Sequence, residues 1–342
     1  LFFYRGPVWL YKKFKYSPNK ESLTHLYIEG SNFTTKVFIN GSIVGKFEGG
    51  YVPFYFEISD HLKDGENILL VQTDNTLNKS SVPTQKTDWW PWGGIVGDVY
   101  IVETPKQFIR NAYLQLNPEN FSQAYFNLEM NDKFPGKEIS LEIPELQYLN
   151  KFITNSSGAI RENIEITPQL WSPANPKLYE VIISSKNESI NDEIGFRSIK
   201  TQGQKIYLNN SEIRFKGIAM HSEPIGIDGP AFSQEHFKEL LSTAKELNIN
   251  FVRAAHYPYT RHLAKIADQF GLMLWEEVPV YWNIDWSNAE TLTIAKNQIT
   301  RLVQRDQNRA SVVVWSVANE TPLSSSRMKF LHTLLTEIEV TD

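Results

Sequence analysis

The sequence predicts antiparallel β-structure up to about residue 205, followed by half of a (β/α)₈ barrel. Before residue 205, short segments rich in Val, Ile, Phe and Tyr alternate with turns. After it, stretches with apolar residues at a period of 3.6 alternate with short, continuously apolar strands. This alternation is typical of a parallel sheet covered by helices. Four consecutive strand–helix units can be counted, and a complete barrel has eight.

The β-rich part opens with a strong hairpin signal. Asn40-Gly41 separates the apolar segments 36–39 and 42–44. Asn-Gly readily adopts the two positive φ angles of a type I′ turn, so these segments are expected to pair. Further strands are predicted over 67–71, 99–102, 124–128, 139–143 and 178–184. The segment 99–102 is uniformly apolar and is therefore expected to be a buried strand.

In the second part, caps and glycines help to place the helices. Ser233 is a suitable N-cap for the first helix, and Gly271 suits the C′ position after the second. Strands are predicted over 213–217, 250–253, 272–275 and 312–315, and helices over about 233–247, 263–270, 288–306 and 325–339.

The composition excludes several classes of function. Lys plus Arg number 34 and Asp plus Glu 39, which gives a net charge of −5 without a basic block and no support for nucleic-acid binding. The absence of cysteine excludes disulfides, thiolate metal sites and a cysteine nucleophile. No apolar run approaches the roughly 18 residues of a membrane span. GxSxG, HExxH and Walker motifs are absent, and His256 and His262 are poorly spaced for a metal on one helix face.

Polar side chains follow each predicted strand of the parallel sheet. They are His221, Arg253, His256, Glu276, Glu277, Asn319 and Glu320. Active sites of parallel β/α barrels lie at the C-terminal ends of the strands. A carboxylate flanked by an amide and surrounded by His, Arg and aromatic rings is suited to general acid catalysis at a sugar acetal.

Each of these residues also has a structural interpretation. Glu320 could be an acidic group near the N-terminus of the last helix, where it would interact with the helix dipole. His256 could be a loop residue bonded to backbone, and Arg253 could be the ion-pair partner of Glu276 or Glu277. The tryptophans at 89, 90 and 92 could pack at the edge of a sandwich.

Two long runs resemble the signatures of glycoside hydrolase family 2, which includes β-galactosidases, β-glucuronidases and β-mannosidases. Residues 250–258 read Asn-Phe-Val-Arg-Ala-Ala-His-Tyr-Pro, and residues 306–320 end in Asn319-Glu320. Shorter matches, in the order that the family shows, are Arg5-Gly6-Pro7-Val8-Trp9, Trp171-Ser172-Pro173, Gly195-Phe196-Arg197 and Phe215-Lys216-Gly217. The resemblance therefore extends over nearly the whole chain.

The resemblance implies three domains. Residues 1–104 would form a jelly-roll sugar-binding domain, 105–203 an immunoglobulin-like sandwich, and 204–342 the first four βα units of a TIM barrel. The order β, β, β/α agrees with the order read from periodicity. Because the chain begins with Leu and stops after four units, we expect a piece of a longer protein, with the family's nucleophile beyond residue 342.

The resemblance also implies roles for individual residues. Glu320 is similar to the general acid/base, and Asn319 to the neighbour that binds the sugar 2-hydroxyl. His256 and His221 resemble residues of the sugar pocket, and Arg253 resembles the strand-end Arg that keeps the nucleophile ionised. Asp88 resembles the jelly-roll aspartate that reaches into the barrel. As a general acid, Glu320 is expected to be buried and to hold its proton near neutral pH.

The implied function is retaining hydrolysis of terminal β-linked sugars, of the β-galactoside or β-glucuronide class, from oligo- or polysaccharides. Residues 278–283 stand where magnesium-dependent β-galactosidases carry a Glu and a His, so neither metal nor cofactor is expected. The alternative is an inactive carbohydrate-binding or scaffold relative. The partner is a carbohydrate, and a homo-oligomer of the full-length protein is left open. Acidic charge and abundant Asn, Ser and Thr favour export to a bacterial periplasm or surface without fixing the compartment.

Overall fold

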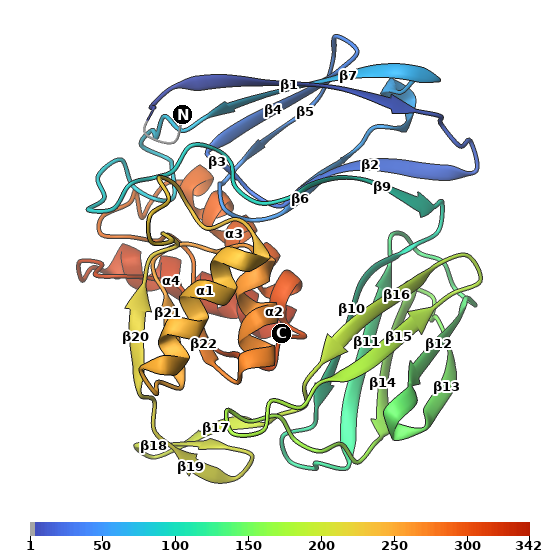
Figure 1. Ribbon diagram of the computed structural model, residues 1–342, viewed down its shortest axis with the longest axis vertical. Coiled ribbons are helices and arrows are strands. Elements are labelled where there is room, and N and C mark those ends of the chain that lie inside the picture. The colour runs from blue at the N-terminus through green and yellow to red at the C-terminus, as the bar shows by residue number, and fades with distance from the viewer. Residues whose placement is uncertain (1–3) are drawn as a thin grey trace.

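The computed structural model describes residues 4–342 and consists of two β units and a parallel β/α unit (Figure 1). In the first β unit, two sheets face each other in the strand orders β1-β7-β4-β5 and β6-β2-β9. Their core contains Leu26, Ile28, Val37, Ile39, Phe54, Ile58 and Val71. The strands are β1 (Pro7–Tyr16), β2 (Ser22–Ile28), β4 (Thr34–Ile39), β5 (Ser42–Glu48), β6 (Phe54–Glu57), β7 (Gly65–Asp74) and β9 (Val99–Pro105), with a small pair β3 (Ser31–Asn32) and β8 (Gly94–Ile95).

The predicted hairpin is confirmed, whereas one predicted strand has the wrong environment. Strands β4 and β5 are joined by Asn40 and Gly41, which both have positive φ, 50° and 86°. The segment 99–102 does form part of β9, but it is exposed rather than buried, and Ile101 is 37% accessible. The reason is its place at the edge of the sheet, where β9 pairs only with β2.

The second β unit also consists of two packed sheets. Their orders are β10-β11-β14 and β13-β12-β15-β16. The strands are β10 (Ile109–Leu116), β11 (Gln123–Met130), β12 (Glu138–Ile143), β13 (Tyr148–Ile153), β14 (Ala159–Glu165), β15 (Tyr179–Ser184) and β16 (Ser189–Ile194). Alternate residues point inward, as in β11, where Ala124, Phe126 and Leu128 are buried. The strands predicted over 124–128, 139–143 and 178–184 are thus confirmed.

A short three-stranded antiparallel sheet leads into the barrel unit. It contains β17 (Ile199–Gln202), β18 (Lys205–Leu208) and β19 (Ser211–Ile213). The strand predicted over 213–217 is therefore wrong in position, because Ile213 pairs with Ile206 in this sheet. The first barrel strand, β20 (Gly217–Met220), starts four residues later, so His221 follows it directly.

The barrel unit has four parallel strands and four helices in alternation. The sheet order is β20-β21-β22-β23, with β21 (Phe251–Ala254), β22 (Met273–Glu277) and β23 (Val312–Ser316). The helices are α1 (Gln234–Glu246), α2 (Arg261–Phe270), α3 (Ala289–Asp306) and α4 (Ser325–Thr341). Ser233 caps α1 by accepting a hydrogen bond from the N–H of His236, and Gly271 ends α2 at a φ of 67°, as predicted.

The three units meet around the barrel helices, with the first unit at the top of Figure 1 and the second at the lower right. The Trp171 Nε1 of the second unit donates to the Asp268 carbonyl of α2 at 2.8 Å. The Gln298 side chain of α3 donates to the Val82 carbonyl of the first unit at 2.8 Å. Across the described residues 4–342, none of the helices combines the length and the apolar character needed to cross a membrane. The domain boundaries drawn from the sequence stay a prediction.

Candidate active site

Glu277, the last residue of β22, is the centre of a hydrogen-bond network at the strand ends. Its side chain is fully buried, with 0% exposure. Arg253 Nη2 donates to both of its oxygens, at 3.0 and 2.8 Å, and His256 Nδ1 lies 2.8 Å from Oε1. Trp275 Nε1 and Ser316 Oγ donate to Oε2 at 3.0 and 2.8 Å. Residues from β21, β22, β23 and the loop after β21 are thus joined through one carboxylate.

Strand geometry explains why Glu277 and not Glu276 reaches this network. Successive side chains in a strand point to opposite faces, so Trp275 and Glu277 share a face and Glu276 takes the other. Burial alone would raise the pKa of Glu277. The hydrogen bonds from His256, Ser316 and Arg253, together with the charge of Arg253, outweigh that effect and lower its pKa. Glu277 is therefore a carboxylate at neutral pH.

Arg253 and His256 are held by this carboxylate. The interpretation of Arg253 as an ion-pair partner is what the structure shows, and the partner is Glu277. The same guanidinium nitrogen donates to Asn319 Oδ1 at 2.7 Å. Because a carboxylate only accepts, Glu277 fixes the tautomer of His256 with the proton on Nδ1. The side-chain partner found for His256 is thus Glu277, and not the backbone group that the structural interpretation expected.

Several buried polar atoms at this site have no hydrogen-bond partner within residues 4–342. They are the amide nitrogen of Asn319, the Nδ1 of His221, the Nε of Arg253 and the Nε1 of Trp89. Buried polar groups are normally hydrogen-bonded, so unpartnered ones at a strand-end site point to a polar ligand. Burial, followed by the positive charge that His256 can carry, lowers the pKa of His221. His221 is accordingly neutral at pH 7.

Aromatic rings line the site on the side of the first unit. His221 and His256 meet edge to face, with ring centroids 5.5 Å apart, and Tyr281 lies 5.2 Å from His256. Trp89 packs 4.8 Å from Tyr257 and 5.9 Å from Tyr281. Trp89 therefore lies against the barrel site, and is not confined to packing at a sandwich edge.

Glu320 lies just beyond β23, and its environment differs from the expectation. Its side chain is exposed, so the predicted burial is wrong. Its Oε2 accepts a hydrogen bond from Trp282 Nε1 at 2.9 Å. The alternative role near the N-terminus of α4 is not observed, because Ser324 caps that helix through the N–H of Arg327.

Asp88 comes from the first unit and reaches the same strand ends. It is exposed, and the hydroxyl of the buried Tyr281 donates to its Oδ1. His221, Arg253, His256 and Asn319 are thus linked by direct contacts, Asp88 joins them through Tyr281, and Glu320 joins them through Trp282, which packs on Tyr281. The sequence identified Glu277 as an acid at a strand end and as one of two candidate ion-pair partners of Arg253, and it gave no role to Tyr281 or Trp282. The alternation of side chains along β22 places Glu276 and Glu277 on opposite faces, but it does not by itself show which face carries the site.

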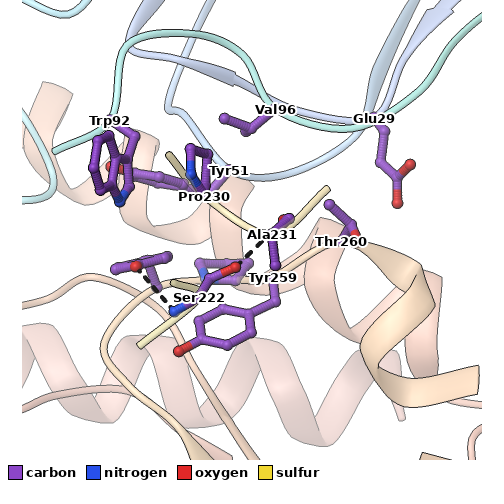
Figure 2. Close-up of a pocket in the computed structure, with 11 residues that line it drawn as sticks. Glu29, Tyr51, Trp92, Val96, Ser222, Pro230, Ala231, Tyr259 and Thr260 are labelled. Carbon is purple, nitrogen blue, oxygen red and sulfur yellow. Dashed lines mark hydrogen bonds between the residues drawn. The ribbon is translucent and has the colours of Figure 1, made fainter. Parts of the chain in front are cut away.

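A small pocket lies beside the site, where the first unit meets the barrel loops (Figure 2). Glu29, Tyr51, Trp92 and Val96 lie on one side of this view, with Ser222 and Tyr259 across from them. Tyr51 stacks on Tyr257 with centroids 4.8 Å apart, and the Ser222 N–H points at the Tyr257 hydroxyl at 3.4 Å. The stack of Tyr51 on Tyr257 therefore joins the first unit to the barrel at this pocket.

A second cluster between the same two units contains potential metal ligands. Ligand atoms of Glu29, Asp98 and His262 lie within 4.8 Å of one another. Arg261 already occupies this cluster: its Nη2 is 3.3 Å from Asp98, and its backbone N–H donates to Glu29 at 2.7 Å. The guanidinium supplies the positive charge that the two carboxylates require, so we interpret the cluster as a contact between units.

The chain matches three family models in succession. They are described as "Glycosyl hydrolases family 2, sugar binding domain" over residues 5–105, "Glycosyl hydrolases family 2" over 107–197 and "Glycosyl hydrolases family 2, TIM barrel domain" over 199–341. The predicted fold class, a jelly-roll sandwich, an immunoglobulin-like sandwich and part of a (β/α)₈ TIM barrel, is confirmed.

Curated relatives are longer than this chain. A putative beta-glucuronidase of Formosa agariphila is 29% identical over 315 residues, which cover 87% of this chain and 38% of the relative. A beta-galactosidase of Thermoanaerobacter pseudethanolicus is 27% identical over 338 residues, which cover 92% of this chain and 44% of the relative. The chain thus spans about two fifths of their length. The solved structure of a Dictyoglomus thermophilum beta-D-glucuronidase superposes with a TM-score of 0.84 at 25% identity, covering 99% of this chain and 64% of that one.

Proposed function

The chain belongs to glycosyl hydrolase family 2, and we propose that it is part of a retaining glycosidase that removes terminal β-linked sugars from oligo- or polysaccharides. The substrate class is a β-galactoside or a β-glucuronide, since relatives with both names match the chain. Glu320 is the proposed general acid/base. The observation that carries the proposal is the meeting of Glu320, Asn319, Arg253, His256 and Asp88 at one end of the parallel sheet.

The unpartnered polar atoms support a sugar ligand. The Asn319 amide nitrogen is a donor beside Glu320, and Arg253 already occupies its oxygen. A sugar hydroxyl would accept from this nitrogen, and His221 Nδ1 would serve a second hydroxyl. The partly exposed ring of Trp282, which packs on Tyr281, supplies aromatic surface beside these groups. Saccharide sites combine such polar groups with aromatic faces because sugars carry hydroxyls around an apolar ring.

In the proposed reaction Glu320 protonates the leaving oxygen while a second carboxylate attacks the anomeric carbon. Its exposed carboxyl group at the rim can reach a bound glycosidic oxygen. After the aglycone departs, the same group takes a proton from a water molecule. That water attacks the anomeric carbon, breaks its bond to the nucleophile and releases the sugar. Retention requires the two carboxyl groups to be about 5–5.5 Å apart.

Glu277 does not suit the nucleophile's role. It is fully buried, and four residues occupy its oxygens. We therefore assign it to the support of Arg253 and His256, and propose that the attacking carboxylate is a residue outside these 342. The isolated 342-residue chain is then expected to show negligible hydrolysis of a nitrophenyl β-glycoside. Measurable turnover by that chain would contradict this assignment.

The acid role is tested by Glu320→Gln in the natural full-length protein. General acid catalysis contributes about 10²–10⁴-fold, so kcat/KM for a β-glycoside with a poor leaving group should fall by about that factor. A dinitrophenyl glycoside needs little protonation and should be affected much less. Glu290→Gln, an exposed acid in the first turn of α3, is the matched control. Equal losses on both substrates would reject Glu320 as the acid, and sugar binding without turnover by the unaltered protein would favour the carbohydrate-binding alternative.

A further inference from the structure

Two adjacent residues in the loop after β22 contact the two exposed carboxylates of the proposed site. The Tyr281 hydroxyl donates to Asp88 of the first unit, and Trp282 Nε1 donates to Glu320 beyond β23. We propose that Tyr281 and Trp282 are positioning residues, Tyr281 acting through Asp88 on sugar binding and Trp282 acting through Glu320 on proton transfer. This inference rests on the proposed function and assigns the two roles to separate side chains.

Backbone pairing holds this loop against the acid/base segment. The N–H of Asn319 donates to the Val280 carbonyl at 2.9 Å, and the N–H of Trp282 donates to the Asn319 carbonyl at 3.1 Å. Tyr281 and Asn319 form a parallel bridge, which continues the pairing of β22 with β23 beyond the strand ends. Trp282 and Glu320 both have positive φ, 49° and 48°. Non-glycine residues adopt this conformation rarely, and where they do it is often part of a functional site.

The indole N–H suits the role assigned to Trp282. An indole nitrogen only donates, so it holds Oε2 of Glu320 in place without competing for its proton. The second oxygen, Oε1, is then left for the proton that passes to the leaving group. The indole packs on the Tyr281 ring, with centroids 4.9 Å apart, which limits its rotation.

Tyr281 is equally suited to hold Asp88. Its ring is 1% exposed and lies between Trp89 and His256. Burial, followed by the hydrogen bond to Asp88, raises the pKa of Tyr281, so its hydroxyl remains a donor throughout the working pH range. Asp88 is exposed and belongs to the first unit, so this bond ties its carboxylate to the barrel site.

The two roles predict different kinetic signatures in the natural full-length protein. Trp282→Phe keeps a ring and removes the donor. It should lower kcat/KM for a poor leaving group about tenfold and leave KM and the rate on a dinitrophenyl glycoside nearly unchanged. Tyr281→Phe should raise KM about tenfold with both substrates, because it acts on the bound sugar and not on the leaving group.

Each variant has a matched control. Trp286 donates an indole hydrogen bond in the same loop, but to Asn283 rather than to a site carboxylate. Tyr16 places its hydroxyl on the Glu103 carboxylate, in the first unit and away from the barrel. Trp286→Phe and Tyr16→Phe should remain within about twofold of the unaltered protein in both kcat and KM.

The Glu320→Gln background separates this inference from the proposed function. If Trp282 acts through Glu320, Trp282→Phe should add no further dependence on the leaving group there. A Glu320→Gln variant that affects all substrates equally would overturn the proposed function itself. The present inference alone would be overturned if Glu320→Gln showed the leaving-group effect but Trp282→Phe had kinetics like those of its control Trp286→Phe. The same would hold if Tyr281→Phe had kinetics like those of its control Tyr16→Phe. Uniform losses of kcat in the two loop variants would likewise indicate a merely structural role.

Discussion

Glu276 and Glu277 are neighbours in β22, yet they face two different regions of the barrel unit. Glu277 faces the strand-end site, where Arg253, His256, Trp275 and Ser316 hydrogen-bond to its oxygens. Glu276 faces the layer between sheet and helices, and neither of its oxygens has a hydrogen-bond partner within residues 4–342. Both side chains are almost completely buried.

The two regions have opposite effects on the charge of a buried carboxyl group. Donors hold the pKa of Glu277 below its ordinary value despite burial. Burial, followed by the negative charge of Asp306, raises the pKa of Glu276 well above its ordinary value, and Arg305, 3.9 Å away, only partly offsets this. The comparison shows that local donors, and not depth, decide whether a buried acid carries charge. A charged acid can organise cations at a site, and a neutral one cannot.

The largest effect is expected from Glu277→Gln. This change leaves Arg253 without its charged partner and places an amide among donors, so breaking the pair should lower the free energy of unfolding by about 3–5 kcal/mol. Asn319 and His256 would lose their fixed positions, and turnover by the full-length protein should fall on all substrates. Urea denaturation and steady-state kinetics would measure these effects.

The control for this prediction is an exposed pair of the same chemistry. Glu129 lies 2.6 Å from Arg110 on the surface of the second β unit, with both side chains at least 41% exposed. Glu129→Gln should change the free energy of unfolding by less than about 1 kcal/mol. If Glu277→Gln lowered the free energy of unfolding no more than Glu129→Gln, the Glu277 carboxylate would not be what holds the site residues in place.

The next effect is the acid dependence of stability. Because the folded-state pKa of Glu277 lies below its unfolded value of about 4.5, its contribution is present above that pH and is lost as the pH falls through the folded pKa. The full-length protein should therefore lose stability in acid, and Glu277→Gln should make this loss shallower. Urea midpoints measured between about pH 3 and 7 would test this. If the urea midpoints of the unaltered protein and of Glu277→Gln fell in parallel with pH, this would contradict the negative charge assigned to Glu277.

A smaller effect is expected from Ser316→Ala, which removes one of the four donors. Ser316 Oγ lies 2.8 Å from Glu277 Oε2, and a hydrogen bond to a charged group contributes about 1.5–3 kcal/mol. With Arg253, His256 and Trp275 still in place, the loss should lie at the lower end of that range. With one donor fewer to stabilise its anion, the folded-state pKa of Glu277 should rise, so the loss of stability in acid should begin at a higher pH. An unchanged acid limb would indicate that Ser316 contributes packing alone.

The sequence predicted the order of the three units, most strands and helices, and the grouping of polar residues at the barrel strand ends, whose roles stay a prediction. Periodicity and capping residues were sufficient to place the helices, as the Ser233 cap of α1 shows. It failed where two locations satisfy the same pattern. The segment around Ile213, in which polar and apolar residues alternate, fits either an antiparallel hairpin or the first barrel strand, and hydrogen-bond register decides between them.

The site details that were missed depend on distances between segments far apart in the chain. The alternation of side chains in β22 separates the two glutamates onto opposite faces, but Met273 and Leu274 are buried on both faces, so the sequence does not show which face carries the site. The exposure of Glu320 and its bond to Trp282 depend on how two loops meet, 38 residues apart. The contact of Asp88 with Tyr281 joins two units across 193 residues. No local pattern encodes such contacts.

The smallest loss of stability is expected from Glu276→Gln. A neutral amide has nearly the shape of a protonated carboxyl, so below the unfolded pKa of about 4.5 the free energy of unfolding should change by no more than about 1 kcal/mol. The sign of the pH effect is opposite to that of Glu277. The folded-state pKa is raised, so the contribution of Glu276 is present below its unfolded pKa and is lost as the pH rises through the folded value. The variant should therefore gain stability over the unaltered protein as the pH rises above about 4.5, which urea midpoints from about pH 4 to 9 would measure. A loss comparable to that of Glu277→Gln would mean that Glu276 is ionised and paired with Arg305, and the contrast between the two faces of β22 would then be incorrect.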